Sequence, residues 1–296
     1  MDEQKIILPF KSRTLKNGEY VIVGKDAEPL IVNASFIEQL SSPDFSVSML
    51  DDKVIEMLST SGYIGSSKKV IIPVPDEGHF VFLKIGRIVC LLFGFISLIF
   101  NLYSIGAYHG VKSGNDLIHL NISGWELFFS AILIALGTSL VHEIFHLIFS
   151  RNIKDFRGKV HLHLFKATAT VSMSHIWAWS AFSRFMAISA GMIADSIFLS
   201  ITILVGIFSP LWIFSIANAV LWIRILWQFR FYSNCDGRIL LQSFFDNPSF
   251  GEKNFIGSVR DKIWNLFFNF MGLIVLVLIL YLWGYPFFMN FLHIYF

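Results

Sequence analysis

The later two thirds of the chain show a repeating hydropathy pattern. From residue 85 onward, apolar runs of about 20 residues alternate with short polar segments. A helix of about 20 residues is about 30 Å long, which matches the hydrocarbon core of a bilayer. The pattern therefore predicts an α-helical polytopic membrane domain over residues 85–296, with five or six transmembrane helices. The predicted spans are 87–108, 125–149, 185–207, 211–230 and 263–283, followed by an apolar tail, YPFFMNFLHIYF, that either lies in the interface or re-enters the membrane.

Residues 1–84 follow a different pattern and predict a small α+β domain. Two β-branched runs, YVIVG at 20–24 and PLIVN at 29–33, are separated by GKDAE, which is typical of a β-hairpin. A short helix is expected next, around FIEQL, with Asn33 or Ser35 as its N-cap.

A second short helix is expected after Ser48 or Asp51, either of which can cap it. Its apolar positions are compatible with a single buried face: Val54, Ile55, Met57 and Leu58. The segment KKVIIPVPDEGHFVFL then has the character of a strand and a linker leading to the first span.

Composition supports a membrane protein and excludes several other classes. Hydrophobic residues make up 55% of the 296 positions and charged residues 15%, whereas a soluble domain carries about 25% charged residues. The net charge is only +2 and the basic residues are scattered, so we expect no nucleic-acid partner. Two cysteines, without CxxC spacing, exclude a disulfide framework.

The distribution of cations predicts the orientation in the membrane, because cytoplasmic loops retain Lys and Arg. Basic residues gather between the second and third predicted spans and between the fourth and fifth, and they also precede the first span. We therefore expect both loops and the N-terminal domain to lie in the cytoplasm. The residues are Arg151, Lys154, Arg157, Lys159, Lys166 and Arg184; Arg230, Arg238, Lys253, Arg260 and Lys262; and Lys84 and Arg87.

The second predicted span contains the motif HExxH near its cytosolic end, within SLVHEIFHLIF. On a helix, His142 and His146 lie one turn apart on the same face, so their imidazoles can bind one metal ion. Glu143 points about 100° away, where it can reach a water beside the metal without being a ligand, as a general base requires. Composition alone predicts roughly 0.01 chance occurrences of this pattern.

Ionisable groups within a span are costly, about 3 kcal/mol each, and a divalent cation would compensate them. The alternative is that both histidines are neutral and hydrogen-bonded to other helices, with Glu143 extending to the interface.

A catalytic zinc site needs a third protein ligand, and Asp236 in YSNCDGRILL is the best candidate. In the predicted topology it returns to the cytosolic side at the depth of His142 and His146, and Gly237 allows a close backbone approach. Asp-Gly is also a common turn. Cys235 is a competing soft ligand, ranked second because adjacent side chains rarely reach the same ion.

These residues resemble the site-two protease family of intramembrane zinc metalloproteases. The similarity covers most of residues 125–245: HEIFH on a membrane helix, the hairpin-like KVHLHLFKATATVSM, SRFMAISAGMIADSIF, and NCDGRILL. It implies one Zn²⁺ per chain with His142, His146 and Asp236 as ligands, and Glu143 as the catalytic base.

The chain departs from the family pattern at several positions. The motif NxxPxxxxDG has Gln228 and Phe231 in place of its asparagine and proline, which implies a divergent substrate or an altered gate. The GPxxN stretch corresponds to Gly191, Met192 and Asp195. Asp195, within the membrane, is expected either to bind a substrate backbone or to pair within the bundle. Gly237 is the other candidate for substrate binding.

The divergent pattern is similar to the subgroup found beside bacterial peptide-modification and peptide-export systems. This implies a multi-pass protein of the bacterial inner membrane, with the proteins of such systems as further partners. The N-terminal domain weakly resembles small winged-helix peptide-binding domains, and either binds a precursor peptide or stabilises the protein.

The primary hypothesis is an intramembrane zinc endopeptidase that acts on a membrane-associated, transmembrane or precursor peptide near the cytosolic face, in peptide maturation or export. A membrane di-iron oxidase would draw on His161, His163 and His175 as well. A third hypothesis is a degenerate, non-catalytic protease fold that takes part in peptide export or immunity.

Overall fold

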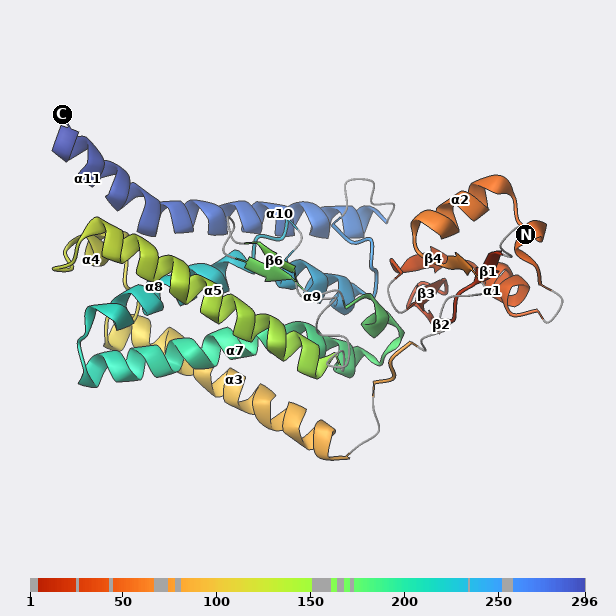
Figure 1. Ribbon diagram of the computed structural model, residues 1–296, viewed down its shortest axis with the longest axis horizontal. Helices are drawn as coiled ribbons and strands as arrows, with labels where there is room; N and C mark the ends of the chain where they lie inside the picture. Colours follow the sequence, from red (N-terminus) through yellow and green to blue (C-terminus); the bar gives the residue numbers. More distant parts are fainter. Residues whose placement is uncertain are drawn as a thin grey trace.

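The computed structural model describes residues 5–24, 27–42, 45–66, 74–77, 81–150, 161–163, 168–170, 173–233, 235–251 and 258–295. Figure 1 shows two parts, a small domain of strands and short helices and a bundle of long helices that extends away from it. The small domain lies at one end of the bundle, and α4 and the C-terminus lie at the other end.

The small domain contains an antiparallel sheet in the order β2-β3-β4. The predicted hairpin is confirmed as β3 (Tyr20–Gly24) paired with β4 (Leu30–Val32), and β2 (Phe10–Thr14) pairs with the other edge of β3. A second, two-stranded sheet joins β1 (Lys5–Ile7) to β5 (Ile64–Ser66).

Two helices cover the sheet of the small domain. The first is α1 (Ala34–Leu40), and its N-cap is Asn33, whose side chain accepts a hydrogen bond from the Phe36 amide. Of the two predicted caps, Asn33 and Ser35, the structure therefore confirms Asn33. The second, α2 (Asp52–Thr60), has Asp51 as its N-cap residue. Leu58 is fully buried, but Met57 is 41% exposed, so the predicted buried face is wrong at that position. Successive residues turn about 100° around a helix, which carries Met57 away from the core.

Among the described residues, four helices are apolar and long enough to cross a membrane. They are α3 (Val81–Ala107), α5 (Gly124–Phe149), α7 (Ala181–Phe208) and a C-terminal helix that begins as α10 (Val259–Ile279). The π-helical turn Leu280–Gly284 joins α10 directly to α11 (Tyr285–Tyr295), so the apolar tail continues this helix. A fifth helix, α8 (Trp212–Trp227), has 16 residues and is shorter than the predicted span 211–230, because the chain turns after Trp227.

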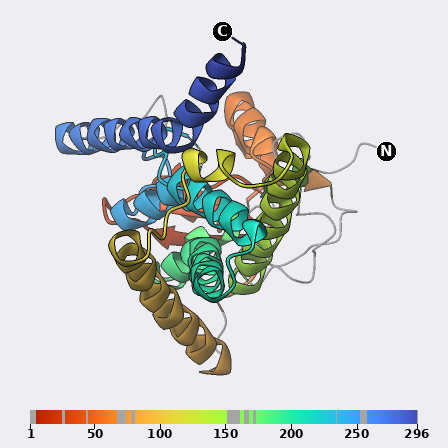
Figure 2. The same ribbon diagram turned by 90° about the vertical axis from the view of Figure 1, so that its left-hand side faces the viewer.

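The helix α7 lies at the centre of the bundle. It packs against α3, α5, α8 and α9 (Asp236–Phe245), and the view along the bundle shows α3 and α10 at its outside (Figure 2). Between α5 and α7 the predicted hairpin is confirmed as β6 (His161–His163) paired with β7 (Thr168–Thr170), whose side chains lie outside the described residues.

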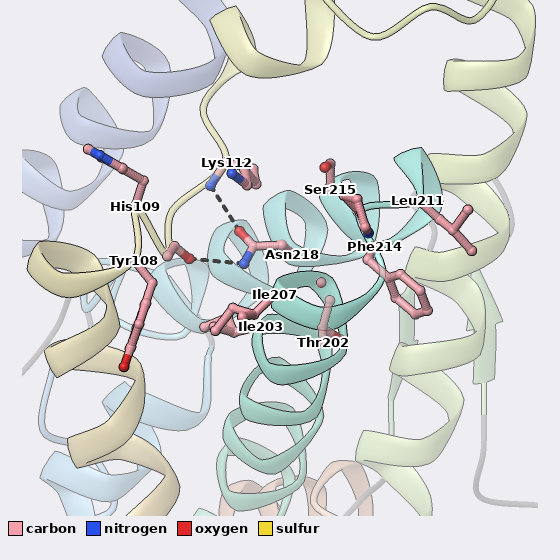
Figure 3. Close-up of a pocket in the computed structure, with 13 residues that line it drawn as sticks. Tyr108, His109, Lys112, Thr202, Ile203, Ile207, Leu211, Phe214, Ser215 and Asn218 are labelled. Atoms are coloured by element: carbon pink, nitrogen blue, oxygen red, sulfur yellow. Dashed lines mark hydrogen bonds between the residues drawn. The ribbon is translucent and has the colours of Figure 1, made fainter.

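At the end far from the small domain, Asn218 of α8 anchors the loop between α3 and α4 (Gly114–Ile118). Its side chain accepts a hydrogen bond from the Lys112 amide and donates one to the Gly110 carbonyl. Figure 3 shows these two bonds beside a cavity of about 190 Å³. These two bonds attach the loop between α3 and α4 to α8.

The small domain is attached to the bundle at the opposite end. Asp246, which ends α9 in a left-handed conformation, is 5% exposed and accepts hydrogen bonds from Arg13 of β2 at 2.6 and 3.0 Å. The Arg184 guanidinium of α7 also lies 2.8 Å from Asp246. The Lys16 amide donates to the same carboxylate at 3.1 Å. One buried carboxylate therefore joins β2, α7 and α9.

Candidate metal centre

His142 and His146 lie in the last two turns of α5, at the end of the bundle nearest the small domain. The carbonyls that end this helix are satisfied, since Arg87 donates to the Phe149 carbonyl at 2.6 Å and His175 Nε2 lies 2.8 Å from the Ser150 carbonyl. The two imidazoles are 4% and 2% exposed. The HExxH turn is therefore held firmly and shielded from solvent.

The two imidazoles converge on Asp236 with their Nε2 atoms. His142 Nε2 lies 2.9 Å and His146 Nε2 3.1 Å from Asp236 Oδ2, and the two Nε2 atoms lie 3.2 Å apart. The three side chains form the group that can hold a metal ion within the described part of the chain. The structure thus brings together His142 and Asp236, 94 positions apart in the chain, which the sequence predicts to share one site.

Asp236 reaches the histidines because α9 begins against the end of α8. The Gly237 amide donates to the Gln228 carbonyl at 3.1 Å, and a Cβ on Gly237 would come within 2.2 Å of that oxygen. Only glycine allows this close approach. Burial alone would raise the pKa of Asp236, but the adjacent His146 and His142 outweigh that effect and lower the pKa below its ordinary value. The ionised carboxylate is the form that binds a metal ion, and the two histidines favour it.

The central helix α7 orients both imidazoles through their Nδ1 atoms. His146 Nδ1 lies 2.9 Å from the Ala187 carbonyl, an acceptor that requires a proton on Nδ1. His142 Nδ1 lies 2.8 Å from Asp195 Oδ2. With Nδ1 donating, each ring turns the lone pair of Nε2 toward Asp236, which is the arrangement of histidines that bind metals.

The spacing of the three ligand atoms fits a metal ion. In a tetrahedral zinc site with bonds of about 2.0–2.1 Å, neighbouring ligand atoms lie about 3.3 Å apart. The observed separations of 2.9, 3.1 and 3.2 Å are close to this value. With both rings donating from Nδ1, neither neutral ring has a proton on Nε2 for Asp236 Oδ2, and a cation is a partner that satisfies all three atoms together. The donor set therefore fits one divalent cation, with a fourth position left for water or substrate.

Glu143 is 9% exposed and lies beside the two histidines in sequence. Its carboxyl group interacts electrostatically with His146 and His142, and also with Arg224. It is not a member of the ligand group. Glu143 is thus a buried carboxyl group within electrostatic range of the two histidines, which suits a proton acceptor.

The other candidate residues have different environments. Asp195 pairs with His142 and with Arg224 of α8, so its observed partners lie on neighbouring helices. Burial raises the pKa of the Cys235 thiol, and its Sγ donates to the Arg230 carbonyl, which disfavours the thiolate that a soft ligand needs. His175 binds the Ser150 carbonyl and is outside the ligand group.

Two groups at the site were not predicted from the sequence: the Arg224 side chain and the Ala187 carbonyl. The charge of Arg224 near the end of an apolar helix was a signal for the first, whereas nothing in a sequence marks a particular backbone carbonyl.

Comparisons with protein-family models, with curated proteins and with solved structures find no match for this chain.

Proposed function

We propose that this chain is an intramembrane zinc metalloendopeptidase of the site-two protease type. The support is the convergence of two histidine Nε2 atoms and one aspartate oxygen at metal-binding distances, with the buried carboxyl group of Glu143 beside them. This combination of donors, with one open position, is typical of catalytic rather than structural zinc sites.

When bound, zinc would polarise the scissile carbonyl and lower the pKa of water toward about 7. The residues of the chain bind the ion and transfer the proton. His142, His146 and Asp236 hold the ion, and Glu143 accepts the proton of the attacking water and passes it to the leaving amine. The Asp236 side chain is 16% exposed, more than either imidazole, so it marks the side from which water and substrate would approach.

The setting of the site supports the proposed substrate class. The metal position lies near one end of apolar helices, at the end that carries the small domain. A membrane-associated, transmembrane or precursor peptide can reach it, and a helical substrate must first unwind, because its amides are internally bonded. We place the protein in the bacterial inner membrane with the small domain in the cytoplasm, and its cleavage near the cytosolic face. Peptide-export or peptide-modification proteins are its proposed partners.

The test compares new protein termini and metal content in cells that express the wild-type chain, Glu143→Gln or His146→Ala. Mass spectrometry of N-terminal peptides detects the cleavage of any protein in the cell, whatever its sequence. We expect wild type to generate new termini in membrane or precursor peptides. The Glu143→Gln protein should retain about one zinc per chain and lose cleavage about 10²–10⁴-fold, since a general base contributes that much. His146→Ala should lose both.

The matched control is Gln39→Glu, a change of similar size on α1, in the small domain away from the metal centre. It should behave as wild type. Undiminished proteolysis by Glu143→Gln, or zinc retained in full by His146→Ala, would overturn the assignment.

A further inference from the structure

Asp195 stands between the candidate metal centre and a buried arginine. It lies in the middle of α7 and is 1% exposed. One of its oxygens lies 2.8 Å from His142 Nδ1, and both lie 3.3 Å from Arg224 Nη2 of α8. The contacts form a continuous chain from Arg224 through Asp195 to His142 and on to Asp236.

The ion pair has little value for stability alone. Burying two charges costs several kcal/mol, and their attraction repays this only with good geometry and additional hydrogen bonds. Here a single nitrogen of Arg224 is shared between two oxygens at long distances, and Arg224 Nε is buried without a hydrogen-bond partner among the described residues. Apolar side chains at both positions would pack α7 against α8 at lower cost.

The ion pair between Asp195 and Arg224 can, however, fix the orientation of the Asp195 carboxylate. A carboxylate with one partner can rotate about its Cα–Cβ and Cβ–Cγ bonds, whereas one held from two sides keeps a fixed direction. His142 approaches from α5 and Arg224 from α8, so Asp195 is held between side chains of two different helices. A fixed acceptor at Nδ1 fixes the plane of the His142 ring and the direction of its Nε2 lone pair.

We propose that Arg224 is a positioning residue for the metal centre, acting through Asp195 to fix the orientation of the His142 ring. This rests on the proposed metal site. Arg224 does not touch the metal position. Its removal should loosen the site without removing any ligand, because outer partners of metal-binding histidines affect metal affinity about 10–100-fold.

The experiment measures zinc affinity of the purified full-length protein by competition with a chromophoric chelator, together with the visible spectrum of the cobalt-substituted protein. Cobalt reports the symmetry of the ligand field, so a misdirected imidazole changes the spectrum even when the ion is bound. The variants are Arg224→Gln, Arg224→Lys, Asp195→Asn and the double variant Arg224→Gln/Asp195→Asn. The control is Arg260→Gln, at an exposed position in the first turn of α10.

We expect Arg224→Gln to weaken zinc binding about 10-fold or more and to alter the cobalt spectrum, with partial rescue by Arg224→Lys. The double variant should be no weaker than the worse single variant, because both changes break the same chain of contacts. Arg260→Gln should match wild type.

Additive effects of Arg224→Gln and Asp195→Asn would overturn the proposal, because they would show that Arg224 acts on the site independently of Asp195. Glu143, a carboxyl group with which Arg224 also interacts, would then be the route. Unchanged affinity and spectrum in Arg224→Gln would also overturn it. If the wild-type protein binds neither zinc nor cobalt, the proposed metal site itself fails, which is a separate result.

Discussion

At the scale of single residues, the candidate metal centre depends on how closely α7 approaches the His142 ring. Gly191 of α7 faces this ring, and a Cβ at that position would come within 2.3 Å of His142 Nε2. The absence of a side chain lets the imidazole lie directly against the helix, with Asp195 one turn further along to accept its Nδ1 proton. Gly191 therefore allows the His142 ring, a candidate ligand, to take its position against α7.

Gly191→Ala should weaken metal binding about 10-fold or more, because the added methyl group displaces the His142 ring. The measurement is zinc affinity by chelator competition, with Gly206→Ala as the matched control. Gly206 also lies in α7, and its nearest contact for a Cβ is Phe214 at 3.8 Å. Both substitutions raise helix propensity, so a loss confined to Gly191→Ala identifies the clash with His142. Equal affinity in the two variants would contradict this account of Gly191.

The ligand set could be proposed from sequence because two of its members share one helical turn. The spacing of His142 and His146 fixes their geometry locally, and the HExxH pattern is rare by chance. Their orientation could not be predicted, since it depends on contacts between helices. Asp195 is 53 positions from His142, and its pairing requires the register of α5 on α7, which no local pattern encodes.

At the scale of elements, hydropathy located the four long apolar helices among the described residues, but not all of their ends. The helix α3 begins at Val81 instead of 87, and the last helix continues through α11 to Tyr295, past the predicted end at 283. Hydropathy also predicted α8 too long at its C-terminal end. Phe229 continues the apolar pattern, but the helix already ends at Trp227. The hydrogen bond from the Gly237 amide to the Gln228 carbonyl ends α8 and begins α9 beside it. The turn between α8 and α9 depends on this contact between backbone atoms, so the hydropathy pattern does not show where the turn begins.

The attachment of the small domain to the bundle depends on Asp246. Burial alone would raise the pKa of Asp246, but hydrogen bonds from Arg13 and Arg184 outweigh this and hold its pKa below the ordinary value. A lowered pKa in the folded state stabilises the docked arrangement at every pH above the unfolded-state value of about 3.9. The stabilisation is lost as pH falls through the lower folded-state pKa.

Asp246→Asn should weaken docking by about 3 kcal/mol, because it leaves the buried Arg184 guanidinium and the partly buried Arg13 guanidinium without their carboxylate. Hydrogen exchange at the turn between β2 and β3 measures the effect when variants are compared at equal pH. Wild type should stay protected from pH 7 to about 4.5 and become less protected below the folded-state pKa, whereas Asp246→Asn should be unprotected throughout.

The control for this comparison is Asp76→Asn. Asp76 pairs with Lys11 of β2, but its side chain is 74% exposed, and exposed ion pairs contribute only about 0–1 kcal/mol. It should match wild type. A turn that is equally protected in Asp246→Asn and wild type would show that other contacts hold the small domain.

At the scale of the whole molecule, the arrangement is asymmetric along the bundle. The outer helices α3 and α10 are largely exposed along apolar faces, which suits a lipid environment, while α7 is half buried among its neighbours. The candidate metal centre and the small domain lie toward one end, and the cavity beside Asn218 lies at the other. The overall class could be predicted from composition, because 15% charged residues cannot cover a soluble surface of this size.

X-ray absorption spectroscopy of the purified full-length protein can observe the proposed zinc ion and its ligands His142, His146 and Asp236. We expect about one zinc per chain, with nitrogen and oxygen ligands at about 2.0–2.2 Å, including two imidazoles. The His146→Ala protein should lose the ion. A sulfur shell at about 2.3 Å would place Cys235 or Cys90 at the metal instead. Two irons per chain, or no bound metal in wild type, would contradict a single zinc site at these residues.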